Sequence, residues 1–217
     1  MKEGFKVSIK KVNKIIKDNN LVSLHTKKFK IVTTNSKHKF TVANNKLNRK
    51  FKVDKLNQVW VADITYIKVI DGWVYLAVVL DLFNKKIVGY QTSKKIDTRL
   101  VLDALEQALQ TRRPSAGLMF HSDRGVQTAS DSFTSAILKA NFVQSMSRKG
   151  NCWDNSPVES FFATLKKELI YPLGLCSGFQ LQRELLEYIH AYYDTVRAHS
   201  SLGYLSPLEF EKIEILE

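Results

Sequence analysis

Two short segments, His121-Ser122-Asp123-Arg124-Gly125 and Asn155-Ser156-Pro157-Val158-Glu159, bound the stretch that decides the fold. Asp123 follows a short apolar run, 117–120, that is typical of a buried strand. Glu159 stands in the first turn of a predicted helix, and 35 residues separate it from Asp123. Ionised carboxylates at such positions are costly to desolvate unless a cation or hydrogen bonds compensate them, so both acids are candidates for a functional site.

A third carboxylate, Asp63, lies inside an apolar segment, 59–67, that predicts another buried strand. A buried salt bridge would explain it, but no Lys or Arg occurs between Lys55 and Lys68 to supply a partner close in sequence. Three acids that meet from a strand centre, a strand end and a helix start repel one another unless they hold a cation. Hard carboxylate oxygens suit Mg²⁺ or Mn²⁺, so the three acids are candidate metal ligands.

The residues leave local roles open for two of these acids. The sequence Asp123-Arg124-Gly125 is good turn chemistry, so Asp123 could serve in a turn or cap a helix. Its neighbours His121 and Ser122 could orient it or a nearby water. Ser156-Pro157-Val158-Glu159 has the pattern of a capping box, in which the glutamate bonds back to the backbone of the first residue. Capping and metal binding compete for the carboxylate of Glu159.

Together, the motifs of this chain resemble those of the DDE transposases of the retroviral-integrase superfamily, specifically the insertion-sequence-three family. The resemblance covers almost the whole chain and rests on four segments: 57–66 with Asp63, 121–125 with Asp123, 145–155, and the helix start from Glu159 to Lys166. It implies an N-terminally shortened transposase in which Asp63, Asp123 and Glu159 are catalytic and hold metal. The spacing of the acids and the flanking motif favour metal binding over capping for Glu159.

The same resemblance implies DNA contacts around the acids. Lys166 lies two helical turns after Glu159, at the offset of a family lysine that contacts DNA ends, although a solvated surface lysine would fit the same spacing. The segment before the glutamate is similar to the flexible active-site loop of the family. We expect three residues of this segment to bind DNA: Arg148, Lys149 and Asn155.

Three further positions stay open. Trp153 could stack on a base or pack inward. The C-terminal segment 192–207 also matches the family, whose members commonly carry Asn where Asp194 stands. His199 in this segment could be catalytic, but capping of a helix end by its cationic form is the favoured interpretation.

Composition and charge fit a globular protein that binds nucleic acid. The 217 residues, 44% of them hydrophobic, can bury one core and a small appendage. Residues 1–55 carry a net charge of +13 and residues 56–217 a net charge of −1. The basic arm suggests a phosphate-backbone partner, although a solubilising tail has the same composition.

Two features that the sequence lacks narrow the class of protein further. No apolar run approaches the roughly 18 residues that a membrane span needs. The two cysteines, Cys152 and Cys176, form no pair of the kind that binds zinc, and reduced thiols are the default. We therefore expect a soluble, cytoplasmic protein that associates with the nucleoid.

Hydrophobic periodicity predicts an α/β protein with the element order βββαβαβα after an N-terminal helix over 8–18. The expected strands are 59–69, 73–82, 86–92, a run that leads to Asp123, and 142–146. The expected helices start at Asp97 or Thr98, near 130, at Glu159 and at 179. The last is one long helix over 179–196. This order matches the ribonuclease-H-like fold that the resemblance implies, a mixed five-stranded sheet flanked by helices and preceded by a basic N-terminal arm.

The domain prediction follows these patterns. It consists of a partial helix-turn-helix remnant (1–24), a basic linker (25–55), a ribonuclease-H-like integrase core (56–170) and a C-terminal helical extension (171–217).

The expected function is that of a transposase catalytic subunit, a DDE-type polynucleotidyl transferase. Two Mg²⁺ (or Mn²⁺) ions would activate a water and stabilise the leaving oxygen, after which the freed 3′-hydroxyl could attack target DNA. The expected partners are double-stranded element ends and target DNA, further copies of the chain on that DNA, and a longer fusion transposase from an overlapping frame. A stand-alone nuclease and a non-catalytic or regulatory DNA-binding remnant of a decayed element are the alternatives. The basic arm and Lys166 argue against the first, and the intact acids argue against the second.

Overall fold

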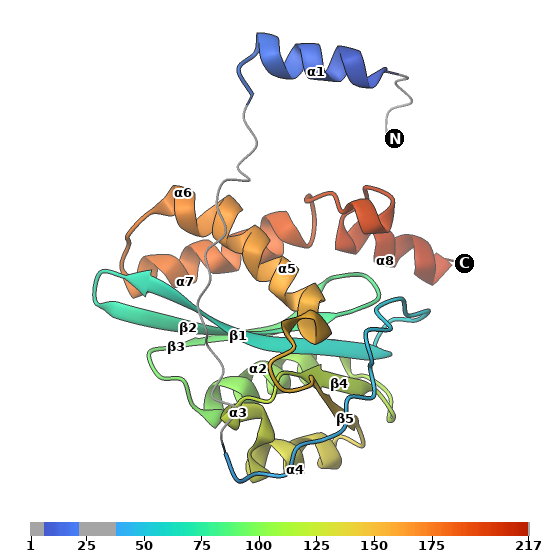
Figure 1. Ribbon diagram of the computed structural model, residues 1–217, viewed down its shortest axis with the longest axis vertical. Helices are drawn as coiled ribbons and strands as arrows, with labels where there is room; N and C mark the ends of the chain where they lie inside the picture. The colour runs from blue at the N-terminus through green and yellow to red at the C-terminus, as the bar shows by residue number, and fades with distance from the viewer. Residues whose placement is uncertain (1–6, 22–37, 217) are drawn as a thin grey trace.

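The computed structural model describes residues 7–21 and 38–216 (Figure 1). Parts of the predicted helix-turn-helix remnant and of the linker therefore lie outside the described residues. The first helix, α1 (Ile9–Asp18), begins after Ser8, whose hydroxyl accepts a hydrogen bond from the Lys11 N–H. This confirms the predicted helix and its N-cap. Every side chain of α1 is exposed, so its apolar stripe is not covered by the described part of the chain.

The centre of the protein is a mixed sheet of five strands in the order β3-β2-β1-β4-β5. The first three strands, β1 (Val59–Val69), β2 (Gly72–Asp81) and β3 (Ile87–Ser93), form an antiparallel meander. The last two, β4 (Met119–Ser122) and β5 (Val143–Met146), continue the sheet parallel to β1. The predicted mixed five-stranded sheet is confirmed. Successive side chains of a strand point to opposite faces, so this sheet needs a helical layer on each side.

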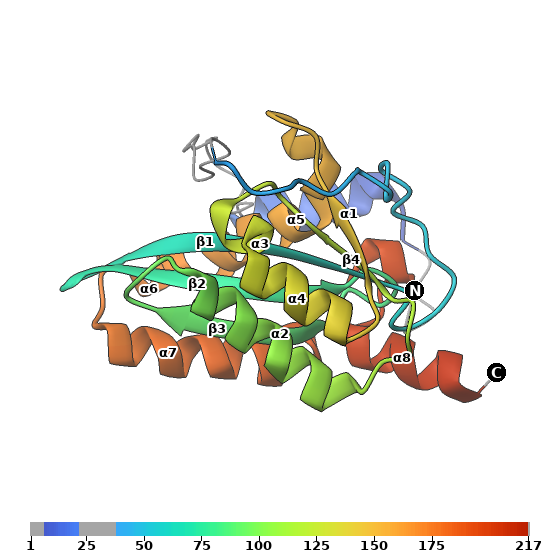
Figure 2. The same cartoon turned by 90° about the horizontal axis from the view of Figure 1, so that it is seen from below.

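Three helices form the lower layer in Figure 1: α2 (Thr98–Arg112), α3 (Val126–Ala129) and α4 (Asp131–Lys139). In Figure 2 these helices lie in front of the sheet, with α2 against β3 and α4 beside β5. A Cβ atom at Gly89 would lie only 2.2 Å from the Ala104 carbonyl oxygen, so the glycine allows α2 to pack closely on β3. The fully buried Trp60, Phe120 and Phe133 belong to the core of this side.

The upper layer is built by α5 (Ser156–Leu165), the π-helical turn η2 (Lys166–Ile170), α6 (Tyr171–Leu173) and α7 (Gly178–Glu187). Phe161 and Leu165 of α5 are buried against β1 and β2, as the predicted core-facing stripe of this helix requires. The predicted long helix over 179–196 is wrong in part. It becomes the π-helix η3 (Tyr188–Tyr193), which turns both Tyr188 and Tyr193 into the core.

Several short elements were not predicted. They are α3, the 3₁₀ turns η1 (Cys152–Asn155) and η4 (Ser200–Leu202), and the last helix, α8 (Pro207–Leu216). The first three have only three or four residues, too few to show a hydrophobic period. In α8, the buried Glu211 replaces an apolar side chain on the inner face of the helix.

Part of the predicted basic linker packs against the hydrophobic core of the sheet. Leu47 is buried, and Phe51 and Val53 pack beside it on the α5 side of the sheet. The backbone N–H groups of Lys46 and Leu47 both donate to the Ser145 hydroxyl, over 2.9 and 3.2 Å. This segment is therefore fixed to β5 by its backbone and to the core by its apolar side chains.

The C-terminal extension fastens onto the meander at two places. Glu211 accepts hydrogen bonds from Asn84, Lys86 and Arg112, and Asp194 accepts one from the Ile87 N–H over 3.2 Å. These contacts join α8 and the end of η3 to the β2–β3 turn and α2. The extension is thus an integral part of the fold.

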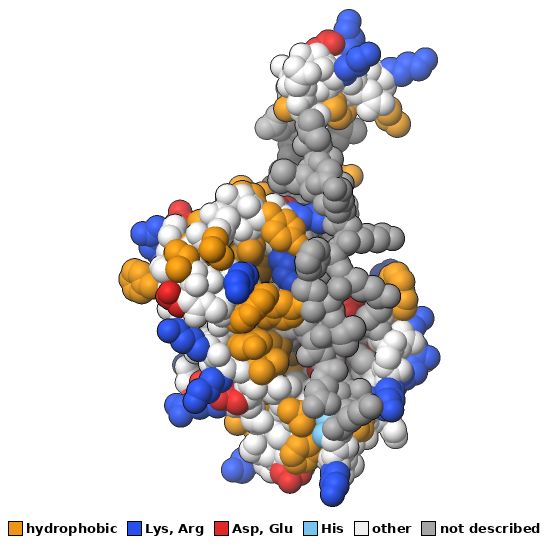
Figure 3. Space-filling model, turned by 60° about the vertical axis from the view of Figure 1, so that its left-hand side comes forward, with side chains coloured by type: hydrophobic (Ala, Val, Ile, Leu, Met, Phe, Trp, Pro, Cys, Tyr) orange, Lys and Arg blue, Asp and Glu red, His pale blue; other side chains and the backbone are white. Residues whose placement is uncertain are grey.

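At the opposite end, the loop between α6 and α7 meets the β1–β2 hairpin, where the Ile70 N–H donates to the Cys176 carbonyl over 2.9 Å. Figure 3 shows hydrophobic side chains gathered on this face of the molecule. The exposed large hydrophobic residues of the hairpin, α6, the loop after α6 and the start of α7 are Ile70, Trp73, Tyr171, Leu175 and Phe179. Among the described residues, none of the helices has the length and hydrophobicity to cross a bilayer.

Burial raises the pKa of the Asp194 carboxyl to about 7, against the smaller opposing effects of the Ile87 hydrogen bond and Lys86. An acid whose pKa is raised on folding favours the folded state at low pH, and that contribution is lost as pH rises toward its folded pKa. We therefore expect Asp194→Asn to stabilise the protein by about 1 kcal/mol or more at pH 8. The gain should shrink as pH falls toward 4. Urea unfolding of both proteins across this range measures it, and an equal difference at both ends would contradict the assignment.

Candidate active site

The parallel pairing of β1 with β4 brings two acids together. Its last aligned pair is Ala62 with Ser122, and the next residues on the two strands are Asp63 and Asp123. Neighbouring strands lie about 4.8 Å apart, so the two carboxylates start from adjacent backbone positions. β4 ends at Ser122, whereas β1 continues to Val69. The acids therefore stand where the sheet narrows and one edge of β1 becomes open.

Helix α5 brings the third acid to the same place. The Asn155 side-chain amide donates to the Ala62 carbonyl over 3.1 Å, which ties the residue before α5 to the residue before Asp63. Glu159 follows Asn155 by one helical turn. Asn155 is only 3% exposed in this structure, and its predicted DNA contact stays a prediction. Its side chain positions α5 against β1.

The charges of the three acids influence one another. Burial raises the pKa of Asp63 well above its usual value, and the charges of Asp123 and Glu159 raise it further. The Ile64 N–H, which donates to Asp63 over 2.8 Å, and the Lys166 ammonium oppose this rise in the pKa of Asp63. Burial also raises the pKa of Glu159. This environment disfavours three ionised carboxylates in the absence of additional positive charge.

Lys166 supplies one positive charge beside the acids. Its ammonium lies 5.5 Å from the centre of the Tyr66 ring, which places it next to β1. Burial lowers the pKa of Lys166, and the nearby Asp63 charge partly restores it. The predicted location of this lysine on the Glu159 side of the helix agrees with that electrostatic coupling to Asp63. A lysine in this position can contact a phosphate that approaches the acids.

The predicted capping box at the start of α5 does not form. The 3₁₀ turn η1 runs directly into α5, so Ser156 already has helical backbone angles, and the N-cap is Asn155 without a side-chain capping bond. The same Ser-Pro-X-Glu pattern recurs at the start of α8, where it does form the box. There the Ser206 N–H donates to Glu209 over 2.8 Å, and the Glu209 N–H donates back to the Ser206 hydroxyl. The Glu159 carboxylate is therefore not used for capping.

Asp123 has the predicted turn role as well as its place in the site. Its Oδ1 accepts the Gly125 N–H over 2.9 Å, and the Thr128 hydroxyl donates to its backbone carbonyl over 3.1 Å. The proposed orienting role of His121 is wrong. Its two ring nitrogens lie within hydrogen-bond distance of the Ser145 and Ser147 hydroxyls, and burial lowers its pKa to about 4, so it is a neutral link between β4 and β5.

An ion-pair cluster orders the segment before α5, and sequence reasoning missed its centre, Asp154. This buried carboxylate accepts bonds from Arg148 (2.7 and 2.8 Å), Arg49 (2.7 Å) and Asn45 (2.8 Å). The Arg148 hydrogen bonds hold the pKa of Asp154 well below its usual range. Arg148 thus has an internal partner, in addition to the DNA contact expected of it.

Two other residues of this segment face the solvent. Lys149 is exposed, which is compatible with the predicted DNA contact. Trp153 is 68% exposed, so of the two roles left open for it the inward-packing one does not occur.

His199 is neutral, and the predicted cationic helix cap is wrong. Burial and the nearby Arg197 charge lower its pKa to about 4. Its ring lies edge to face with Tyr193, with the ring centres 5.0 Å apart. The His199 side chain lines a pocket beside α5.

The three acids converge without forming a closed metal cage. Across residues 7–21 and 38–216, no three carboxylate, imidazole or thiol groups have the arrangement of a ready-made metal site. The donor set is nevertheless all oxygen and carries three negative charges, which is the chemistry that hard divalent cations bind. The charges of Asp123 and Glu159 both act on Asp63, so these two acids lie within electrostatic range of Asp63.

Comparison with known proteins identifies the family. Residues 54–152 and residues 141–207 each match an integrase core domain family. The chain is 38% identical over 211 residues to the transposase for insertion sequence element IS904 of Lactococcus lactis, covering 96% of this chain and 82% of that protein. It is 35% identical over 209 residues to the transposase InsF for insertion sequence IS3A of Escherichia coli, covering 96% and 72%.

The chain belongs to the insertion-sequence-three family of transposases. It is therefore a polynucleotidyl transferase that acts in DNA cleavage and transposition, as the sequence predicted.

Solved structures show that this transposase has the retroviral integrase fold. The catalytic core domain of HTLV-2 integrase in complex with magnesium superposes with a TM-score of 0.58 at 18% identity, over 71% of this chain and 96% of that one. An intasome structure of simian T-cell lymphotropic virus gives the same TM-score at 19% identity, over 82% and 60%. The predicted ribonuclease-H-like fold is confirmed.

Asp154 gives a test of how the transposase holds its active-site segment. We expect Asp154→Ala to destabilise the protein by roughly 2 kcal/mol, because the hydrogen bonds that Arg148, Arg49 and Asn45 donate to this buried carboxylate are lost. A carboxylate with a lowered pKa stabilises the fold above its unfolded pKa of about 4, so the difference between the two proteins should shrink as pH falls below that value. Urea unfolding at pH 7 and pH 3 measures both effects.

Asp103→Ala is the matched control, because Asp103 pairs only with the exposed Arg99 at 3.6 Å on the surface of α2. It should change stability by less than about 1 kcal/mol. Equal losses for the two variants would mean that the Asp154 cluster has no special structural role.

Proposed function

We propose that this transposase cleaves the ends of an insertion sequence and joins the freed 3′ ends to target DNA with two Mg²⁺ ions held by Asp63, Asp123 and Glu159. The proposal rests on the convergence of the three acids. The β1–β4 register sets Asp63 beside Asp123, and the Asn155 bond holds the start of α5, which carries Glu159, against β1. The magnesium complex of HTLV-2 integrase supports divalent metal use in a related fold. Metal ions bound by the acids would activate the attacking oxygen and stabilise the leaving one.

The chain's own residues position the DNA for this reaction. Lys166 is placed to hold a phosphate against the acids, and the exposed Lys149 can add a second contact from the preceding loop. The Asn155 clamp and the Asp154 cluster keep that loop and α5 at a fixed distance from β1. Such preorganisation lowers the barrier because the reacting groups need little rearrangement.

We propose that the protein works as an oligomer on double-stranded DNA. The intasome of the simian virus and the dimeric form of the HTLV-2 core support assembly in related folds. The mixing of this chain with a longer fusion transposase from an overlapping frame stays a prediction.

The two alternatives differ in measurable ways. A stand-alone nuclease would cleave DNA but would not join a pre-cut end to a second duplex. A non-catalytic remnant would bind DNA without either reaction. The intact acids and their convergence favour catalysis over the remnant, and the position of Lys166 beside Asp63 favours joining over simple cleavage.

The acids are tested by neutral replacements. We expect Asp63→Asn, Asp123→Asn and Glu159→Gln each to reduce Mg²⁺-dependent cleavage and joining by at least about 1,000-fold, because several kcal/mol of transition-state stabilisation are lost. Without divalent ions, Asp63→Asn and Glu159→Gln should keep or raise the melting temperature, since both acids have raised pKa values. An end-mimicking duplex and thermal unfolding provide the two measurements.

Asp71→Asn is the control, because Asp71 is exposed at the tip of the β1–β2 hairpin. It should leave both activities unchanged. Substantial Mg²⁺-dependent activity in one of the three acid variants would remove that residue from the site.

Lys166 is tested separately. We expect Lys166→Ala to weaken binding of a pre-cut end and to reduce joining by roughly tenfold, because one charge-assisted phosphate contact is lost. Lys139→Ala, at an exposed position on α4, should have no such effect. If Lys166→Ala joins DNA normally but unfolds more readily, the lysine serves the packing on Tyr66 and the contact is wrong.

A further inference from the structure

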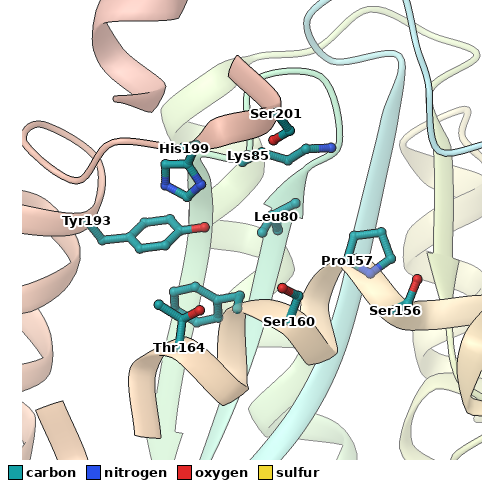
Figure 4. Close-up of a pocket in the computed structure, with 10 residues that line it drawn as sticks. Leu80, Lys85, Ser156, Pro157, Ser160, Thr164, Tyr193, His199 and Ser201 are labelled. Carbon is teal, nitrogen blue, oxygen red and sulfur yellow. The ribbon is translucent and has the colours of Figure 1, made fainter. Parts of the chain in front are cut away.

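A pocket lies beside α5, on a different stripe of the helix from Glu159. It has a volume of about 350 Å³ and is lined by α5, the end of β2, the turn after it and the C-terminal segment. Figure 4 shows Ser156, Ser160 and Thr164 along one side of α5, facing Tyr193, His199, Ser201 and Lys85 across the pocket. Pockets that bind ligands span roughly 300–1,000 Å³, so this one suits a small chemical group.

The lining has the chemistry of an anion site. It contains one cationic side chain, Lys85, and no Asp or Glu. Five hydroxyls line it, those of Ser156, Ser160, Thr164, Tyr193 and Ser201, and within the described structure none of them forms a hydrogen bond to protein. These groups can therefore all donate to a ligand.

His199 and Lys85 contribute the side-chain nitrogen atoms that line this pocket. The Nε2 atom of His199 is buried and has no hydrogen-bond partner among the described residues. The Lys85 ammonium donates to the Leu82 carbonyl over 2.6 Å, which leaves other N–H donors of the same group available. Burial lowers the pKa of Lys85. An anion in the pocket would offset that desolvation and satisfy the unused donors.

The position of the pocket connects it with the acids. Ser156, Ser160 and Thr164 recur every four residues and form one stripe of α5, whereas Glu159 and Lys166 lie on another. A helix with its side chains is about 10–12 Å across, so both flanks are within reach of one nucleic-acid strand that crosses α5. The exposed Ala163 lies between the two stripes of α5, and its small side chain does not obstruct a strand that crosses from one stripe to the other.

We propose that this pocket binds a phosphate group of the DNA backbone where the DNA crosses α5 beside the active site. The inference rests on the proposed function, because it takes the DNA to lie on the acids. Lys85 supplies the charge, and the α5 hydroxyls and the His199 ring supply hydrogen bonds. The C-terminal segment, which provides His199 and Ser201, thereby becomes part of the DNA-binding surface.

The test compares DNA binding by two kinds of variant in the full chain, without divalent ions. Lys85→Gln removes the charge, so affinity for a duplex should fall roughly tenfold. The slope of log affinity against log salt should also fall by about 0.9. The double variant Ser160→Ala with Thr164→Val removes two uncharged donors, so affinity should fall several-fold while the slope stays unchanged. Lys139→Gln, on exposed α4, is the control and should match the wild type.

A loss of affinity in Lys85→Gln without the change in slope would show a structural effect and overturn the proposal, as would wild-type binding by both pocket variants. A second arm measures melting temperature in inorganic phosphate and in chloride at equal ionic strength. Stabilisation by phosphate that Lys85→Gln abolishes, together with normal DNA binding by that variant, would assign the pocket to free phosphate and overturn the DNA assignment. Binding without metal is independent of catalysis, so the acids can fail their own test while this pocket passes.

Discussion

The mutual repulsion of three carboxylates at a partly desolvated place is the constraint on which the rest of this structure depends. Asp63 and Asp123 are adjacent because β1 and β4 run parallel and their pairing ends one residue earlier. An antiparallel β4 would not present its carboxyl end beside the same residue of β1. The fold must therefore stabilise an arrangement that its own charges oppose, and it does so with contacts on both sides of the acids.

Those contacts come from segments far apart in the chain. The Asn155 amide reaches the Ala62 carbonyl, and the residue before it, Asp154, gathers Arg49 and Arg148. On the opposite side, Ser145 joins His121 to the backbone of Lys46 and Leu47. Residues 45–49 thus hold the end of β5 and the loop before α5 together. This segment is therefore linked by hydrogen bonds to both flanks of the acids.

The sequence was sufficient to predict the helices and strands that depend on hydrophobic periodicity and residue type. The meander, α2, α4 and α5 have clear apolar patterns, and two of the acids, Asp63 in β1 and Glu159 in α5, interrupt those patterns. It was insufficient where tertiary context decides between equal local patterns. Ser156-Pro157-Val158-Glu159 and Ser206-Pro207-Leu208-Glu209 have the same capping signature, yet only the second forms the box. The difference is η1, whose 3₁₀ turn continues into α5 and makes Ser156 helical, and nothing within the four-residue pattern encodes it. Asn155 was predicted as a DNA contact from the family resemblance, and the local sequence could not reveal its hydrogen bond to β1, which joins residues 93 positions apart.

Helix α5 links these observations, because it contributes side chains both to the acidic site and to the pocket lined by the C-terminal segment. Its buried side, Phe161 and Leu165, fixes its rotation on the sheet. That rotation directs Glu159 to the acids and the Ser156, Ser160 and Thr164 stripe to the C-terminal segment. The two faces cannot be adjusted independently, because turning the helix to improve one withdraws the other. The π-helical turn η2 begins at Lys166, directly after the last buried residue of α5, so the regular α-helical repeat ends where the buried side ends. The packing of α5 is therefore the feature through which the extension, despite its distance in sequence, is coupled to the catalytic edge of the sheet.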